Sequence, residues 1–176
     1  MDAPAVSSGT LVVYYSRSGY TRKAAMKIAA ACGGDVEELH DMASRTGVFG
    51  YLRSSLEGLA GLETQLARGK HDPAKYRIVV VGTPIWFWSL ASPVRTWLRH
   101  HRRALAEVAF FCTCGSSGED RARSQLESIL RRPAVASLGL TDAEIDTGAH
   151  TPKIHRFVER FSEGRSTSAR RTRAAT

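Results

Sequence analysis

Three short apolar runs constrain the fold of this 176-residue chain more than any other feature. They span residues 11–15, 78–81 and 108–112, and each is followed by Ser, Gly or Thr. The runs are continuous rather than alternating in polarity, which is typical of strands that are buried on both faces. Strands of that kind occur almost always in parallel sheets, because helices then cover both sides. The runs therefore predict a parallel sheet between two layers of helices.

Helical segments separate these runs. Good helix formers or cap signals mark residues 21–31, 93–101, 119–130 and a last helix that begins near Thr151-Pro152. Weaker strand patterns cover residues 35–39 and 143–146. Strands that alternate with helices predict an α/β fold with right-handed crossovers. Residues 40–71 contain five glycines and are long for one connection, so we expect an excursion or lid there.

Composition places the chain among globular proteins of one domain. It is 43% hydrophobic and 24% charged, which is ordinary for a folded domain. No apolar run approaches the roughly 20 residues of a membrane span. The first ten residues lack the charged start and apolar stretch of a signal peptide. We therefore expect a soluble, cytoplasmic protein that does not enter a membrane.

The positive charge is concentrated at the C-terminus. The net charge is +8, and residues 165–176 contain four arginines, no acidic residue and no large apolar side chain. This composition predicts a disordered basic tail after a folded domain over residues 1–164. Of the 25 basic residues, 21 remain in that domain against 17 acidic ones. The balance argues against nucleic acid as the partner of the folded part.

The loop after the first run has the chemistry of an anion site. Ligands of parallel α/β sheets bind beyond the carboxyl ends of the strands. Residues 16–21 offer hydroxyls at Ser16, Ser18 and Thr21, a glycine for a tight turn, and the free N–H groups of a helix N-terminus. A phosphate dianion fits such a loop. An ordinary helix start that is capped by Ser or Thr has the same sequence pattern, so the pattern is compatible with both. The sequence matches neither the Walker A loop nor the dinucleotide fingerprint.

Two further loops follow the other runs. Residues 83–88 carry three successive aromatic side chains, which could form a stacking wall for a flat heterocycle or fold beneath neighbouring helices. Residues 113–116 are small, so their backbone could approach a ligand closely or form a flexible turn. Together the three loops describe a ligand with a phosphate at one end and a planar ring system at the other.

These segments resemble the flavodoxin family. The resemblance rests on residues 12–21, on residues 80–86 and on the Gly/Ser loop before Glu119-Asp120, and it extends from about residue 10 to residue 161. It implies a doubly wound five-stranded parallel sheet of order 2-1-3-4-5 with helices on both faces, and a non-covalently bound FMN. The implied FMN contacts are Ser16, Arg17, Ser18, Gly19, Tyr20 and Thr21 for the phosphate, and Thr83, Pro84, Ile85, Trp86, Phe87, Trp88, Thr113, Cys114, Gly115 and Ser116 around the ring.

Three functions are compatible with such a site. An electron carrier would serve redox partner proteins, an NAD(P)H-dependent oxidoreductase would reduce a quinone or similar acceptor, and a non-redox module would bind another phosphorylated heterocycle. No second nucleotide fingerprint is visible, which favours the carrier. Flavodoxins are usually acidic, whereas this chain is basic, so the resemblance does not identify the partner. The sequence is compatible with a monomer or a homodimer.

The cysteines and histidines suggest no other chemistry. Three cysteines in total form no disulfide framework and no zinc pattern. A phosphatase loop built on Cys114 would need arginine where Asp120 stands. Cys112 and Cys114 lack the Cys-x-x-Cys spacing of a redox pair, so we expect a core residue and a small loop residue. No histidine pair has the spacing of a metal site.

Overall fold

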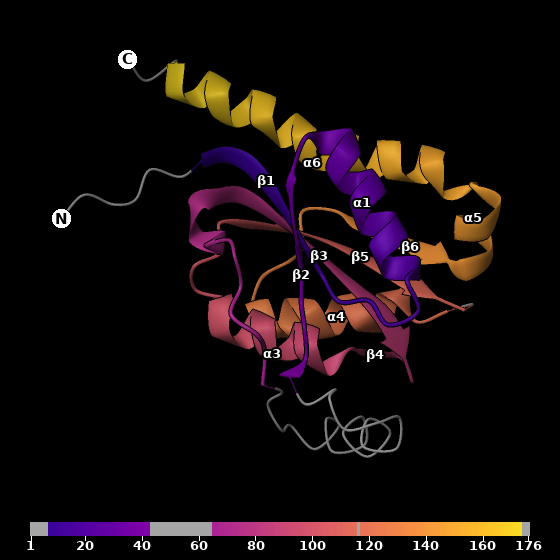
Figure 1. Cartoon of the computed structure of the whole chain (residues 1–176). Helices are drawn as coiled ribbons and strands as arrows, with labels where there is room; N and C mark the ends of the chain where they lie inside the picture. The colour runs from indigo at the N-terminus through magenta and orange to yellow at the C-terminus, as the bar shows by residue number, and fades with distance from the viewer. Residues whose placement is uncertain (1–6, 43–64, 116, 174–176) are drawn as a thin grey trace.

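A computed structural model of the chain describes residues 7–42, 65–115 and 117–173, with the backbone alone for residues 7, 8 and 163–173 (Figure 1). Most of the excursion expected over residues 40–71 lies outside the described residues. The described part forms one sheet with helices on both of its faces.

The sheet has five parallel strands in the predicted order. They are β1 (Ser7–Tyr14), β2 (Asp35–Glu38), β3 (Tyr76–Trp86), β5 (Glu107–Cys114) and β6 (Ser137–Thr141). Their spatial order is β2-β1-β3-β5-β6, which is 2-1-3-4-5 when only the parallel strands are counted. The flavodoxin-like fold class is therefore confirmed. A short strand that the sequence did not predict, β4 (Ser89–Leu90), pairs antiparallel with the end of β3.

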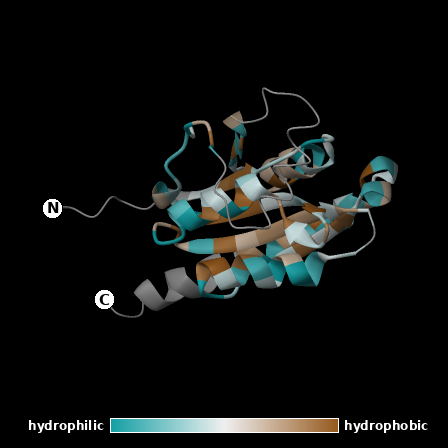
Figure 2. Ribbon diagram, turned by 90° about the horizontal axis from the view of Figure 1, so that it is seen from below, coloured by the Kyte–Doolittle hydropathy of each residue, from teal (hydrophilic) through white to brown (hydrophobic). Residues whose placement is uncertain are grey.

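The helices divide between the two faces. α1 (Tyr20–Cys32), α5 (Asp142–Thr147) and α6 (His150–Arg173) lie on one face, and α3 (Ser92–His101) and α4 (Glu119–Leu130) lie on the other (Figure 1). A short 3-10 helix (Pro73–Lys75) leads into β3. Figure 2 shows hydrophobic strands between two helical layers whose outer surfaces are hydrophilic.

Alternate side chains of each strand pack into two separate hydrophobic cores, one on each face of the sheet. Val12 and Val80 contribute to the core beneath α1 and α6, whereas Leu11, Val13 and Val81 contribute to the core beneath α3 and α4. All five are completely buried. Because successive strand side chains point to opposite faces, a continuous apolar run fills both cores at once.

One expectation needs correction near the C-terminus. Residues 143–146 were expected to form a strand, but they belong to α5, and the strand is β6 just before them. Thr141 and Glu144 form a capping box in which each side chain accepts a hydrogen bond from the other residue's backbone N–H, and this starts the helix. The backbone of α6, the last helix, continues through Arg173. Extension of an existing helix needs no new nucleus, and Ala and Arg favour it.

Candidate functional site

The loop between β1 and α1 folds around one hydroxyl. Ser16 Oγ accepts hydrogen bonds from the backbone N–H groups of Gly19 and Arg22, each at 3.2 Å. Gly19 precedes the helix with a φ of +94°, a conformation that glycine adopts without strain. The loop thus reaches the start of α1 in a tight turn, and the N–H groups of Tyr20 and Thr21, which these two hydrogen bonds do not use, lie at the carboxyl edge of the sheet.

Arg22 and Tyr20 make other contacts. The Arg22 guanidinium forms two hydrogen bonds to the Glu38 carboxylate, at 2.6 Å and 3.1 Å, and this pairing raises the arginine pKa. Tyr20 donates its phenolic hydrogen to Asp146 of α5 at 2.9 Å. Because this hydroxyl already donates to Asp146, Tyr20 can contribute its backbone, but not its hydroxyl, to an anion in the loop. The loop itself is free of carboxylates, since no acidic residue occurs between Tyr15 and Gly34.

A buried hydroxyl pair joins the first loop to the third. Thr21 Oγ1 lies 2.8 Å from Thr113 Oγ1, and both side chains are almost fully buried. Thr21 lies in the first turn of α1, and Thr113 lies near the end of β5, so the contact bridges 92 positions of sequence. Two of the three predicted loops are therefore connected directly.

The second predicted loop is the tip of a hairpin. Residues 83–86 continue β3, and Ile85 and Trp86 pair with Leu90 and Ser89 of β4. Phe87 and Trp88 form the two-residue turn with positive φ values of 49° and 57°, which matches a type I′ turn. The two residues are 79% and 55% exposed. The aromatics at this tip are thus presented outward rather than covered by helices.

Trp86 connects the hairpin to the first loop. Its ring lies edge-to-face with Tyr15, with centroids 6.1 Å apart, and the Arg17 guanidinium lies 5.8 Å from the centroid of the Trp86 ring. Both contacts are within the range of favourable aromatic and cation–π interactions. The first loop and the hairpin therefore lie side by side.

Thr83 has a structural position in this hairpin. Its side chain is completely buried, its hydroxyl donates to the Pro84 carbonyl at 2.9 Å, and it accepts from the Ala91 N–H at 3.1 Å. Pro84 is also buried. The side chains at these two positions are therefore enclosed by the protein.

Gln125 of α4 holds the hairpin, and no sequence pattern marks it. Its side-chain oxygen accepts from Ser89 Oγ at 3.2 Å and from the Leu90 N–H at 3.1 Å. Its side-chain nitrogen donates to the Trp88 carbonyl at 3.3 Å. One amide thus satisfies three polar groups around a turn that carries two left-handed non-glycine residues.

Gln125→Ala is expected to lower the free energy of unfolding by about 2 kcal/mol, because the Leu90 N–H loses its acceptor. Urea denaturation followed by circular dichroism measures the change. Ser128→Ala, on an exposed position of the same helix, is the control and should stay within about 0.5 kcal/mol of the parent. Equal stability of the two variants would show that the three hydrogen bonds do not support the hairpin.

The third loop packs against the hairpin. β5 includes Thr113 and Cys114, so the connection to α4 is limited to residues 115–118, of which Ser116 lies outside the described residues. Gly118 has a φ of +119°, and a Cβ there would lie 3.0 Å from Ile85 Cγ2 and 3.4 Å from Trp88 Cδ1. Gly115 is exposed, with open space where a side chain would be. A cavity of about 590 Å³ lies beside this loop, with Trp88, Cys114 and Ser117 in its wall.

The cysteines at the end of β5 are buried. Cys112 is completely inaccessible, and burial raises the pKa of its thiol. Cys114 is 8% exposed and is the last residue of the strand, rather than part of the loop. A protonated, buried thiol is a poor nucleophile, so Cys112 has the properties of a core residue.

Alkylation can test this placement. We expect iodoacetamide at mildly alkaline pH to modify Cys112 about a hundredfold more slowly in the folded protein than in urea, because the thiolate forms only when the core opens. Peptide mass spectrometry measures the rate at each site. Cys32, which is partly exposed, should react in both states and serves as the internal control. Rapid modification of Cys112 in the folded protein would contradict this result.

The structure thus brings parts of all three predicted loops together through contacts at Thr21, Trp86 and Gly118. Within the described residues no group of three or more His, Cys, Asp or Glu side chains is arranged to hold a metal ion. Among the described helices, none combines the length and the apolar character that crossing a bilayer requires.

Comparison with known proteins agrees with this architecture. The family model described as Flavodoxin matches residues 9–151. A flavoprotein from Lactobacillus acidophilus NCFM, solved in complex with FMN, is 25% identical, with a TM-score of 0.63 over 81% of this chain and 99% of that chain. The apo-form of the flavoprotein from the same organism is also 25% identical, with a TM-score of 0.61 over 81% and 97% of the two chains.

More distant structures share the fold. A WrbA-like flavodoxin from Agrobacterium tumefaciens is 13% identical, with a TM-score of 0.53 over 87% of this chain and 96% of that chain. At that identity the likeness concerns the fold alone. No curated protein matches the sequence.

Proposed function

This chain belongs to the flavodoxin family, and from that premise we propose that it binds FMN non-covalently between its three loops and transfers electrons through it. The observation that carries the proposal is the convergence of a hydroxyl-rich helix N-terminus with outward-facing aromatic side chains at one sheet edge. In this proposal residues 16–21 hold the phosphate, residues 83–88 lie beside the ring, and residues 113–116 flank its opposite edge.

The first loop suits a phosphate dianion. Its N–H groups, the hydroxyls of Ser16 and Ser18, and the Arg17 guanidinium supply donors and positive charge. The nearest carboxylate on β2, that of Glu38, is already neutralised by Arg22. Within the described residues the hydroxyl hydrogen of Ser16 has no acceptor, so it can be donated to a ligand. The hydrogen-bond donors and the positive charge of the first loop therefore match the negative charge of a phosphate group.

The hairpin suits a flat ring system. Trp86 is fixed between Tyr15 and Arg17, and Phe87 and Trp88 are exposed beyond it. Such side chains gain dispersion and apolar burial when a planar heterocycle stacks on them. FMN supplies the one- and two-electron redox chemistry when it is bound, and the chain's residues bind it, orient it and exclude water from it.

The proposal is tested by titrating the purified protein with FMN and following flavin fluorescence. We expect quenching that saturates at one FMN per chain. Addition of NADPH to the loaded protein then separates the two redox functions. A carrier keeps its flavin absorbance with NADPH and loses it with dithionite, whereas an NAD(P)H-dependent oxidoreductase is bleached by NADPH. Absence of any FMN binding would overturn the proposal.

A further inference from the structure

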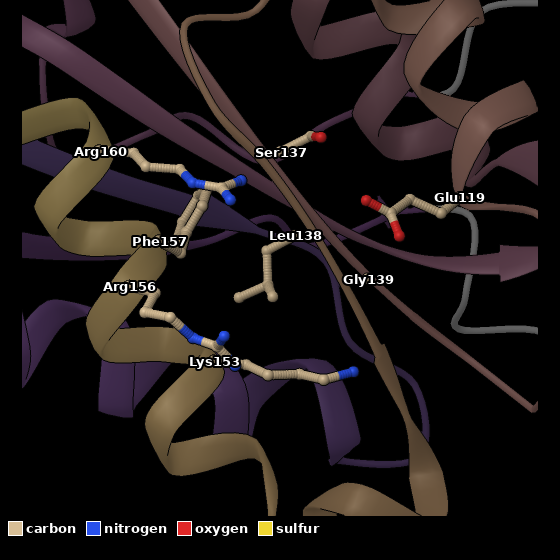
Figure 3. Close-up of a pocket in the computed structure, with 8 residues that line it drawn as sticks. All are labelled: Glu119, Ser137, Leu138, Gly139, Lys153, Arg156, Phe157 and Arg160. Carbon is tan, nitrogen blue, oxygen red and sulfur yellow. The ribbon is translucent and has the colours of Figure 1, made fainter.

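A positively charged groove runs along the outer side of β6 (Figure 3). Lys153, Arg156 and Arg160 of α6 form one wall, and Glu119 of α4 lies on the other side of the strand. Residues 137–139 of β6 form the floor of this cavity of about 270 Å³. It shares Glu119, Gly139 and Lys153 with the larger cavity beside Trp88. The groove thus leads from the third loop along the sheet edge.

The two edges of the sheet are protected differently. Residues 65–71 lie beside β2 and the residues that follow it. The Ala67 N–H donates to the His40 carbonyl, and the His71 N–H donates to the Glu37 carboxylate. β6 pairs with β5 on one side, and no described residue pairs with it on the other. Edge strands of this kind present unpaired N–H and C=O groups that can accept another strand.

The charge on the α6 wall is largely uncompensated. Lys153 forms an ion pair with Glu144 at 2.5 Å. Arg156 and Arg160 are exposed and form no ion pair with any described residue. Their positions, with Lys153, repeat at three and four residues, so all three lie on one helix face and span about 10 Å. Glu159, the acidic neighbour on α6, does not line the groove.

We propose that an extended acidic segment of a partner protein adds to β6 as a further strand. Alternate side chains of a strand lie on one face at a spacing of about 6.8 Å, so two or three acidic residues at every second position would face the α6 cations. Strand addition combines backbone hydrogen bonds with side-chain recognition. A second copy of this chain is a poorer occupant, because twofold pairing of two β6 edges would bring the arginine walls together.

The proposal goes beyond the proposed FMN function and does not depend on it. The two features are nevertheless adjacent, since the groove shares lining residues with the cavity at Trp88 and Cys114. A segment bound along β6 would therefore place its protein next to the third loop. Opposite charges on the two proteins would also accelerate their encounter.

The experiment uses a fluorescently labelled short peptide that alternates glutamate and valine, and measures its anisotropy with the purified full chain. Arg156→Glu/Arg160→Glu is expected to weaken binding by about tenfold or more. The control Lys75→Glu/Arg103→Glu makes the same change of net charge at exposed positions away from the groove, and should weaken binding by less than about threefold. Equal losses in the two variants would overturn the proposal.

Two N-methylated peptides test strand addition itself. One carries the methyl groups on the glutamate amides and the other on the valine amides. Because successive N–H groups of a strand point to opposite sides, only one set faces β6, so one peptide should bind and the other should lose about tenfold or more in affinity. Equal binding by the two peptides overturns strand addition. Displacement of the parent peptide by short single-stranded DNA at lower concentration than by unlabelled peptide would assign the groove to nucleic acid instead.

Discussion

Ser18→Asp is expected to reduce the affinity for FMN about a hundredfold and to leave the affinity for riboflavin unchanged within about threefold. Ser18 is an exposed residue of the loop that we propose holds the phosphate. An added carboxylate there would repel the dianion, whereas riboflavin has no phosphate to repel. Fluorescence titration with each flavin measures both affinities.

Ser117→Asp provides the matched control. It adds the same charge to the exposed third loop, which the proposal places at the ring rather than at the phosphate. The ratio of FMN to riboflavin affinity should therefore stay close to that of the parent. If Ser18→Asp weakens both flavins equally, the first loop does not hold the phosphate, and the orientation of FMN in the site has to be reversed or abandoned.

Gly82→Ala is expected to destabilise the fold by about 3 kcal/mol, at the upper end of the range for overpacked cores. Gly82 lies in the middle of β3, between Tyr14 of β1 and Phe111 of β5. A Cβ at this position would collide with the Phe111 ring, which is completely buried and cannot move into solvent. Urea denaturation measures the loss.

A second substitution separates collision from a general intolerance of side chains in β3. Phe111→Leu alone removes buried surface and should cost about 1–2 kcal/mol. Combined with Gly82→Ala it frees the space that the new Cβ needs, so the double variant should be more stable than Gly82→Ala alone. Additive losses in the double variant would show that the ring is not what excludes a side chain from position 82.

The order of strands and helices was predictable because local signals and tertiary burial agree. The runs at residues 11–15, 78–81 and 108–112 supply half of β1, the middle part of β3 and most of β5. Continuous apolar character identifies such strands because both faces are covered. The sequence of β6 indicates a strand more weakly, because Gly139 interrupts its five residues and the alternation of polar and apolar side chains is short. The pair Thr141 and Glu144 was the available clue that a helix follows.

The candidate site was predictable as a set of loops, but not as a set of contacts. Hydroxyls and aromatic side chains at strand ends indicate a ligand site, because the carboxyl ends of parallel strands share one edge. The pairing of Thr21 with Thr113 depends on which strands are neighbours, and no local pattern encodes it. The hairpin also escaped prediction, because Phe87-Trp88 lacks the Gly or Asn that normally marks a two-residue turn. Gln125 is recognisable only once α4 lies beside that turn.

The hydroxyl pair between Thr21 and Thr113 has a kinetic consequence. It fastens the start of α1 to the end of β5 through the protein's own side chains, so an incoming molecule meets two walls that already have a fixed separation. Little further ordering of these two loops is then needed when the ligand binds. The observed association rate should consequently rise in direct proportion to ligand concentration, without the plateau that a slow isomerisation of the receptor would impose.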